Sequence, residues 1–284
     1  MPDRRRFLQI TGAAIAASAA PRALRALPPW LTADRIDRVG IQLYTVRGAM
    51  EKNVESTLAR VAKIGYREVE FAGYFGRTPA QIRAALDANG LEAPSAHIAI
   101  ADVRSPDWTR TLEGARTMGH RYLIVAWLDQ NDRVSRDSYR AIADALLAGG
   151  AKAAEFGITL GYHNHNFEFT PLDGKTGLEV MLDRTAGSTV VFEMDLYWII
   201  SAGQDPVAWF ERFPGRFPLV HVKDSAGPPK YEMRDVGAGT IDWKRILSHH
   251  AQAGIKYYFV EHDDPPDPFA SAAASYAYLE RLTF

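Results

Sequence analysis

The chain alternates short apolar runs with amphipathic segments along almost its whole length. Eight runs rich in β-branched, aromatic and other apolar residues have the character of buried strands: 39–44, 68–71, 91–98, 121–127, 158–165, 189–195, 217–223 and 256–261. The segments between and after them have helical spacing or helix-start signals: 52–64, 79–89, 105–119, 135–156, 178–184, 205–213, 242–253 and 268–282. The pattern predicts eight strands and eight helices in strict alternation.

Local residue signals support these boundaries and the fold they indicate. Thr78-Pro79 and Asp205-Pro206 each place a capping side chain before a proline, which suits the first helical position. Gly90 and Gly254 stand where two helical segments stop. Strands joined by helical crossovers run parallel, and eight such units most often close into a (β/α)8 barrel. An open doubly wound sheet is the competing fold, but no glycine-rich dinucleotide fingerprint follows the first strand.

The composition fits one such barrel and narrows its chemistry. The chain has 284 residues, a usual length for a single barrel, and 47% of them are hydrophobic. Lys and Arg total 33 and Asp and Glu 34, so the net charge of -1 gives no reason to expect nucleic acid or an anionic membrane as a partner. Cysteine is absent, which excludes disulfides, thiolate ligands and a cysteine nucleophile. A metal site in this chain must therefore use His, Asp and Glu.

The N-terminus has the pattern of an export signal. Three arginines precede Phe7-Leu8, and a weakly hydrophobic, alanine-rich run follows at 10–20. This order is typical of a twin-arginine signal and predicts a periplasmic or secreted protein. The alternatives are a disordered basic arm or a short membrane anchor, although the run is short for a bilayer span and we expect no stable membrane insertion. We therefore expect an export signal and leader in residues 1–30 and one barrel domain in residues 31–284.

Residues that bind metals or move protons follow the predicted strands. The C-terminal ends of parallel strands meet at one rim of a barrel, so side chains there converge on one cavity. The strand-end residues of this kind are His97, His163, Asn164, His165, Glu168, Glu193, Asp195, His221, Lys223, Asp224, Glu261, His262, Asp263 and Asp264. Neighbouring buried carboxylates repel each other and lose hydration unless a cation lies among them. One divalent ion (Mn, Zn, Co, Fe or Mg) with oxygen and imidazole ligands would remove that cost.

Each of these residues also has an ordinary structural explanation. A single histidine such as His97 or His163 is more often a capped core group or a loop contact. Asp195 alone could cap the next turn, and Glu261 alone could pair with an arginine. Their joint occurrence on strands five to eight favours a metal or catalytic centre.

The motifs around these residues resemble a known family. They are 40–47 (GIQLYTVR), 69–71 (VEF), 95–97 (SAH), 162–169 (YHNHNFEF), 194–198 (MDLYW), 220–224 (VHVKD) and 260–262 (VEH). Together they are similar to the sugar phosphate isomerase/epimerase family, which has a xylose isomerase-like TIM barrel. The resemblance covers nearly all of the chain after the export segment and is specific for the superfamily, not for one substrate. It implies a sugar isomerase or epimerase, or a related dehydratase or lyase.

The resemblance also implies a ligand set. Much of that family holds its metal with Glu, Asp, His and Glu at the ends of strands five to eight. Asp195, His221 and Glu261 match the last three positions, whereas the strand-five position departs from the pattern. His163 is the first choice for the fourth ligand, and Glu168 is the rival.

Further roles follow from the same resemblance. His165 is similar to a catalytic histidine of dehydratase relatives, and Lys223 to a lysine that contacts the substrate. The candidate catalytic groups are His165, Glu261 and Glu168, and the candidate substrate contacts are His97, Lys223 and Glu168. The implied reaction begins with proton abstraction next to a carbonyl, and the fate of the intermediate decides between epimerisation, isomerisation and elimination.

The expected partner is a small sugar-like molecule. Sugar phosphates are scarce outside the cytoplasm, so a free sugar, a keto-sugar or an inositol derivative fits an exported protein better. The alternative function is a non-catalytic periplasmic sugar-binding protein, which needs no base beside a metal. A nuclease is disfavoured by the net charge of -1 and by the export signal. Both a monomer and a homo-oligomer are compatible with the sequence.

Overall fold

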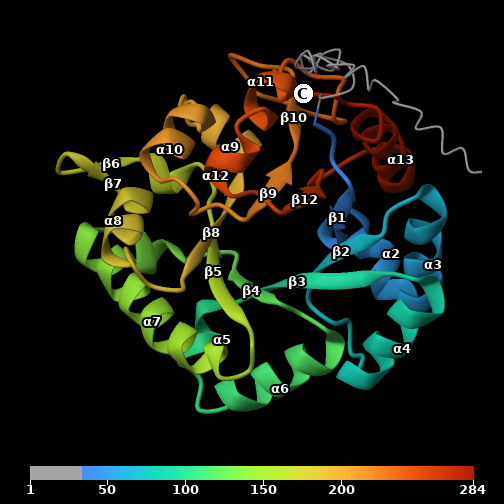
Figure 1. Ribbon diagram of the computed structural model, residues 1–284, viewed down its shortest axis with the longest axis horizontal. Coiled ribbons are helices and arrows are strands. Elements are labelled where there is room, and N and C mark those ends of the chain that lie inside the picture. The colour runs from blue at the N-terminus through green and yellow to red at the C-terminus, as the bar shows by residue number, and fades with distance from the viewer. Residues whose placement is uncertain (1–33) are drawn as a thin grey trace, which may run out of the picture. The chain divides into compact units, whose positions relative to one another are not determined.

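Eight parallel strands close into a barrel in the computed structural model, which describes residues 34–284. The strands are β1 (Gly40–Gln42), β2 (Glu68–Ala72), β3 (Glu92–Ile98), β4 (Tyr122–Val125), β5 (Thr159–His163), β8 (Val191–Asp195), β9 (Leu219–Val222) and β12 (Tyr257–Val260). They pair in that order, and β12 pairs with β1 to close the ring. Figure 1 looks along the barrel and shows the helices as an outer ring. The (β/α)8 barrel predicted from the alternating pattern is confirmed, while the predicted export signal lies outside the described residues.

The helices differ from the predicted segments mainly where one segment becomes two. The α-helices are α2 (Arg47–Lys52), α3 (Val54–Ile64), α4 (Pro79–Asn89), α5 (Ile100–Arg104), α6 (Trp108–Met118), α7 (Arg136–Ala154), α8 (Gly177–Arg184), α9 (Leu196–Ser201), α10 (Pro206–Arg212), α11 (Trp243–Leu247), α12 (His250–Ala253) and α13 (Pro268–Leu279). Short 3-10 helices lie at Leu43–Val46, Gln130–Arg133 and Phe167–Phe169. The predicted helix 242–253 is interrupted at 248–249, and α5 lies before the predicted helix 105–119.

Capping residues explain why the predicted starts and stops hold. Thr78 accepts a hydrogen bond from the backbone N–H of Gln81, whose side chain accepts one from the backbone N–H of Thr78, so α4 begins with a complete capping box. Gly90 ends the same helix in the left-handed conformation, with φ of 60°, which glycine adopts without steric cost. The outer ring is thus defined largely by local sequence.

An apolar layer fills the barrel below its C-terminal rim. Ile124, Leu219, Tyr257 and Phe259 are buried together inside the ring of strands. Gly161 on β5 makes room for this layer, because a Cβ atom there would lie 2.6 Å from Cδ1 of Ile124. The polar residues at the C-terminal strand ends therefore lie above a packed apolar layer and not above an open pore.

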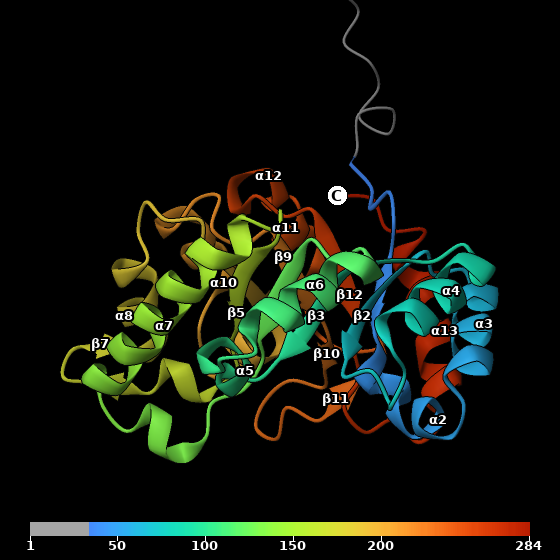
Figure 2. The ribbon, with the colours of Figure 1, turned by 90° about the horizontal axis from the view of Figure 1, so that it is seen from below.

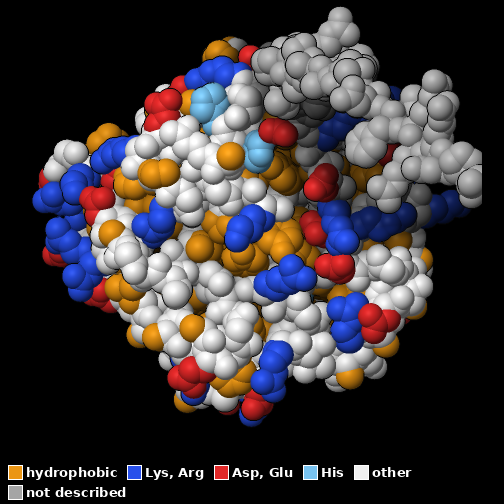
Figure 3. All heavy atoms as spheres, in the orientation of Figure 1, with side chains coloured by type: hydrophobic (Ala, Val, Ile, Leu, Met, Phe, Trp, Pro, Cys, Tyr) orange, Lys and Arg blue, Asp and Glu red, His pale blue; other side chains and the backbone are white. Residues whose placement is uncertain are grey.

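The two ends of the barrel carry different features. The hairpin of β10 (Asp224–Ser225) and β11 (Met233–Arg234) lies at the C-terminal rim, at the lower side of Figure 2. A smaller hairpin joins β6 (Pro171–Leu172) to β7 (Lys175–Thr176). The opposite end faces the viewer in Figure 3 and shows apolar side chains among charged ones. A cavity of about 540 Å³ there is lined by Arg38, Glu68 and Arg121, among others, and by none of the predicted site residues.

No helix among the described residues has the length and apolar character needed to cross a bilayer.

Candidate metal and active site

Three of the predicted metal ligands converge at the C-terminal rim. His163 ends β5, Asp195 ends β8 and His221 lies on β9; all three are buried, and their ligand atoms lie within 4.8 Å of one another. Oδ2 of Asp195 is 3.3 Å from Nε2 of His163 and 3.8 Å from Nδ1 of His221. Ligand bonds of about 2.0–2.2 Å in a tetrahedral zinc site place neighbouring ligand atoms about 3.3–3.6 Å apart. These three residues, called the mouth group below, therefore fit a divalent ion.

The two carboxylate oxygens of Asp195 have different partners. Oδ1 accepts the backbone N–H groups of Tyr197 and Trp198 and so caps the start of α9. Oδ2 faces His163 and lies 3.1 Å from Nζ of Lys223. Although burial opposes ionisation, Lys223 and His163 hold the pKa of Asp195 well below its usual range, so the group is a carboxylate.

Glu261 and Lys223 lie beside the mouth group. Oε2 of Glu261 is 2.7 Å from Nδ1 of His221 and 2.7 Å from Nζ of Lys223. Lys223 is almost fully buried and also contacts Asp263 at 2.8 Å. Burial would lower the pKa of Lys223, but the surrounding carboxylates of Asp195, Glu261 and Asp263 raise it well above the usual value. Glu261, one of the predicted metal ligands, thus adjoins the mouth group together with a permanent cation.

His165 lies against the mouth group in aromatic surroundings. Its ring centre is 4.9 Å from that of His163, and its Nδ1 is buried without a hydrogen-bond partner. Burial, helped by the neighbouring His163 and Lys223, lowers the pKa of His165 to about 2, so the imidazole is neutral. The flanking aromatic rings are those of Trp127, Phe167 and Trp198. Trp127 is about half exposed.

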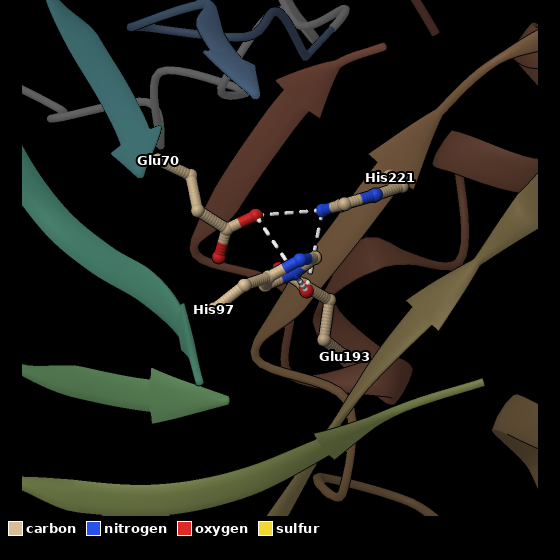
Figure 4. A group of neighbouring side chains, drawn as sticks. All are labelled: Glu70, His97, Glu193 and His221. Carbon is tan, nitrogen blue, oxygen red and sulfur yellow. Dashed lines mark hydrogen bonds and ion pairs between the residues drawn. The ribbon is translucent and has the colours of Figure 1, made fainter. Parts of the chain in front are cut away.

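A second cluster lies next to the mouth group on the far side of His221. It consists of Glu70 on β2, His97 on β3, Glu193 on β8 and His221 itself, and it is called the deep group below (Figure 4). Nε2 of His97 is 2.8 Å from Oε2 of Glu193, and Nε2 of His221 is 2.7 Å from Oε2 of Glu70. Burial alone would lower the pKa of His97, but Glu70 and Glu193 raise it to about 9. These four ligand atoms also lie within 4.8 Å of one another, so this group too could hold a metal ion.

Glu168 does not lie with either group. Its Oε1 accepts the hydroxyl of Tyr162 at 2.5 Å, and its Oε2 accepts the backbone N–H of His165 at 2.8 Å. Burial raises the pKa of Glu168 to about 7. Both oxygens hold the turn after β5, so the structure offers His163, and not Glu168, as the strand-five member of the mouth group. The catalytic and substrate-binding roles expected for Glu168 stay predictions.

Glu70 was not among the predicted site residues, and Glu193 was predicted only as a strand-end residue without a role. Both glutamates are fully buried. Asp224, another strand-end acid, has a different role: its Oδ2 accepts hydrogen bonds from the backbone N–H of Gly237 and the indole N–H of Trp243, which fix the loop after β9. A signal for Glu70 was present, because Glu68 and Glu70 alternate with Val69 and Phe71 along β2. Alternate residues of a barrel strand point inward, so a charged residue at every second position of a buried strand indicates an interior polar group.

Curated relatives of the chain include inosose dehydratases and a rhizopine catabolism protein. An inosose dehydratase of Geobacillus kaustophilus (strain HTA426) is 24% identical over 194 residues, which is 60% of this chain and 61% of that protein. An inosose dehydratase of Lacticaseibacillus casei is 21% identical over 81% of this chain and 90% of its own length. The rhizopine catabolism protein MocC of Rhizobium meliloti is 23% identical over 81% of each chain.

Solved structures share the same barrel. A sugar phosphate isomerase/epimerase from Parabacteroides distasonis ATCC 8503 superposes with a TM-score of 0.75 and 25% identity, covering 86% of this chain and 93% of that one. The IolI protein with a bound zinc atom superposes with a TM-score of 0.65 and 14% identity, covering 84% of this chain and 95% of its own. The second likeness concerns the fold alone, because so low an identity carries no more.

A family model described as the xylose isomerase-like TIM barrel matches residues 58–282. This span includes seven of the eight barrel strands and every residue of the mouth and deep groups. The chain belongs to the xylose isomerase-like TIM barrel family.

Proposed function

We propose that this chain is a metal-dependent enzyme that removes a proton next to the carbonyl of a sugar, a keto-sugar or an inositol-derived ketone. The observation that carries the proposal is the convergence of His163, Asp195 and His221 beside a buried lysine and a neutral histidine. A site that combines a ligand set, a cation and an uncharged base is what enolisation of a polyhydroxylated ketone needs. Relatives named inosose dehydratases support this substrate class.

Each side chain of the site has a distinct proposed role. His163, Asp195, His221 and Glu261 would hold the metal, which would draw electrons from the substrate carbonyl and stabilise the negative charge left by proton removal. His165 is assigned as the base, because its ring lies against the mouth group and its Nδ1 has no hydrogen-bond partner among the described residues. The buried ammonium of Lys223 supplies fixed positive charge at the same site, where little water screens it.

Among the possible outcomes we favour elimination. Epimerisation needs an acid/base group on each face of the substrate, and His163 stands where many relatives have one of two glutamates. Elimination needs only one base: the C–H electron pair forms the C=C bond, and the β C–O bond breaks. His165 then returns its proton to the departing oxygen, so that water or an alcohol leaves and the site is restored.

Uptake of solvent deuterium tests the proposal whatever the fate of the intermediate. The metal-loaded protein is incubated in D₂O with a panel of inososes, keto-sugars and ketohexoses, and deuterium at the carbon next to the carbonyl, or loss of water, is followed by NMR. We expect exchange or dehydration with at least one compound, and loss of it in His165→Gln but not in His249→Gln, a change on the helical outer layer. Sugar binding without exchange or turnover on the whole panel would favour a binding protein instead.

We also propose that the enzyme is exported through the twin-arginine pathway, on the strength of the arginines and the alanine-rich run before residue 21. Replacing Arg4 and Arg5 by Lys in the full chain should keep the protein in the cytoplasm of a bacterial host. Unchanged export of that variant would contradict this part of the proposal.

A further inference from the structure

His221 lies between the mouth group and the deep group and offers one ring nitrogen to each. Its Nδ1 is 2.7 Å from Oε2 of Glu261 and 3.8 Å from Oδ2 of Asp195. Its Nε2 is 2.7 Å from Oε2 of Glu70 and 3.2 Å from Oε2 of Glu193 (Figure 4). The ring is fully buried, so the surrounding side chains decide which nitrogen carries a proton.

Glu70 is fixed by neighbours on both adjacent strands. Gln42 on β1 donates its side-chain N–H to Oε2 of Glu70 at 2.7 Å. Ser95 on β3 donates its hydroxyl to Oε1 at 2.5 Å. Glu70 is fully buried, and these bonds leave its carboxylate one orientation, with Oε2 toward His221. A carboxylate held in this way is a permanent hydrogen-bond acceptor for that ring.

Two contacts of the deep group have the lengths of hydrogen bonds. The contacts of His221 with Glu70 and of His97 with Glu193 are 2.7 and 2.8 Å long, which are ordinary lengths for charge-assisted hydrogen bonds. Ligand atoms around a tetrahedral zinc ion would stand about 3.3 Å apart. The two contacts of Asp195 in the mouth group measure 3.3 and 3.8 Å. The deep group has two contacts of 2.7 and 2.8 Å and two of 3.2 Å, and the shorter pair places Glu70 at hydrogen-bond distance from His221.

We infer that Glu70 is a positioning residue for His221: it accepts the Nε2 proton and thereby leaves Nδ1 as the nitrogen that faces the mouth group. The inference rests on the proposed function, because it assigns Nδ1 to metal binding. His97 completes the support, since its ring stacks on that of His221 at 5.1 Å and 15° while its Nε2 contacts Glu193. A carboxylate behind a metal-binding histidine fixes its tautomer and orientation and raises its basicity.

Metal affinity is the first test. Cobalt(II) or zinc binding is measured by calorimetry on the full barrel for the wild type, Glu70→Ala and Glu70→Gln, with circular dichroism to check folding. We expect binding about 10–100-fold weaker in Glu70→Ala. Glu70→Gln should lose less, because its amide oxygen still accepts the Nε2 proton. Glu68→Gln is the matched control, since Glu68 lies on the same strand but near Arg38 at the opposite end of the barrel.

Two results would overturn the inference: equal affinity in Glu70→Ala and wild type, or two ions per wild-type chain that fall to one in Glu70→Ala, which would make Glu70 a ligand. A metal-free measurement separates the inference from the proposed function. A ¹⁵N–¹H NMR spectrum of the wild type should show a slowly exchanging proton on Nε2 of His221. The signal is assigned by its loss in His221→Asn, and we expect it to be absent in Glu70→Ala. If the wild type binds no metal, the proposed function fails, but the NMR signal of the Nε2 proton still tests the role of Glu70. Absence of this signal from the wild type would overturn the positioning role of Glu70.

Discussion

Lys223 places its ammonium nitrogen 2.7 Å from the Glu261 carboxylate, on the side of the mouth group where an oxygen ligand is expected. The same nitrogen is 3.1 Å from Asp195, so one tethered cation contacts two acidic groups of the site. A divalent ion and the ammonium would therefore share the same carboxylates, and their charges repel each other.

Lys223→Met should consequently tighten metal binding while it lowers activity. Removing a unit charge a few ångströms from a divalent ion favours the ion by more than 1.4 kcal/mol at an effective dielectric of about 20, so we expect an affinity gain of at least about tenfold. Turnover should fall because the developing oxyanion loses a cation. Calorimetry and the deuterium assay measure the two effects, with Lys244→Met on the exposed side of α11 as control. Weaker metal binding in a folded Lys223→Met protein would show that the lysine helps the ion.

The two oxygens of Asp195 should be separable by mutation. Asp195→Asn keeps an oxygen that can cap α9, whereas Asp195→Ala removes the cap, which is worth about 1 kcal/mol. Both variants lose the charged Oδ2 that faces His163, so both should lose most metal affinity. Urea unfolding of the metal-free proteins should find the Asn variant more stable than the Ala variant by roughly that amount. Equal stabilities would mean that the cap contributes nothing.

Glu168 should make the free energy of unfolding decrease as pH rises. Its pKa is raised from 4.5 to about 7 by burial, so the folded state holds a proton that the unfolded chain has already released. The stabilisation is fully present below pH 4.5 and is lost as pH rises through about 7, by about 3 kcal/mol in all. The free energy of unfolding of wild type minus that of Glu168→Gln, measured from pH 4 to 8, should decline across this window. Parallel curves for the two proteins would refute the assignment.

The fold could be predicted from the sequence because its signals are local. Apolar runs, caps such as Thr78 and stops such as Gly90 are read within a few residues, and eight alternating units leave few ways to close a sheet. The short hairpins and helix α9 were not predicted. Asp195 ends a strand, as expected, and its side chain also caps the start of that helix, which is the structural role considered for it in the sequence.

The site could be predicted only in part, because strand ends reveal which residues converge but not where each side chain turns. His163 and Glu168 are five positions apart, and only the folded turn shows that Glu168 points back to Tyr162. Glu70 was not predicted because it lies inside β2 and not at the strand end, and only the alternation along the strand marks it as inward-facing.

The metal content of the purified mature protein tests the central claim most directly. Elemental analysis is compared for wild type, His163→Ala and Glu168→Gln, with circular dichroism to confirm folding. We expect about one divalent ion per wild-type chain, loss of the ion in His163→Ala and full retention in Glu168→Gln. A folded wild type that takes up no divalent ion when one is supplied, or a Glu168→Gln protein that loses it while His163→Ala keeps it, would contradict the site described here.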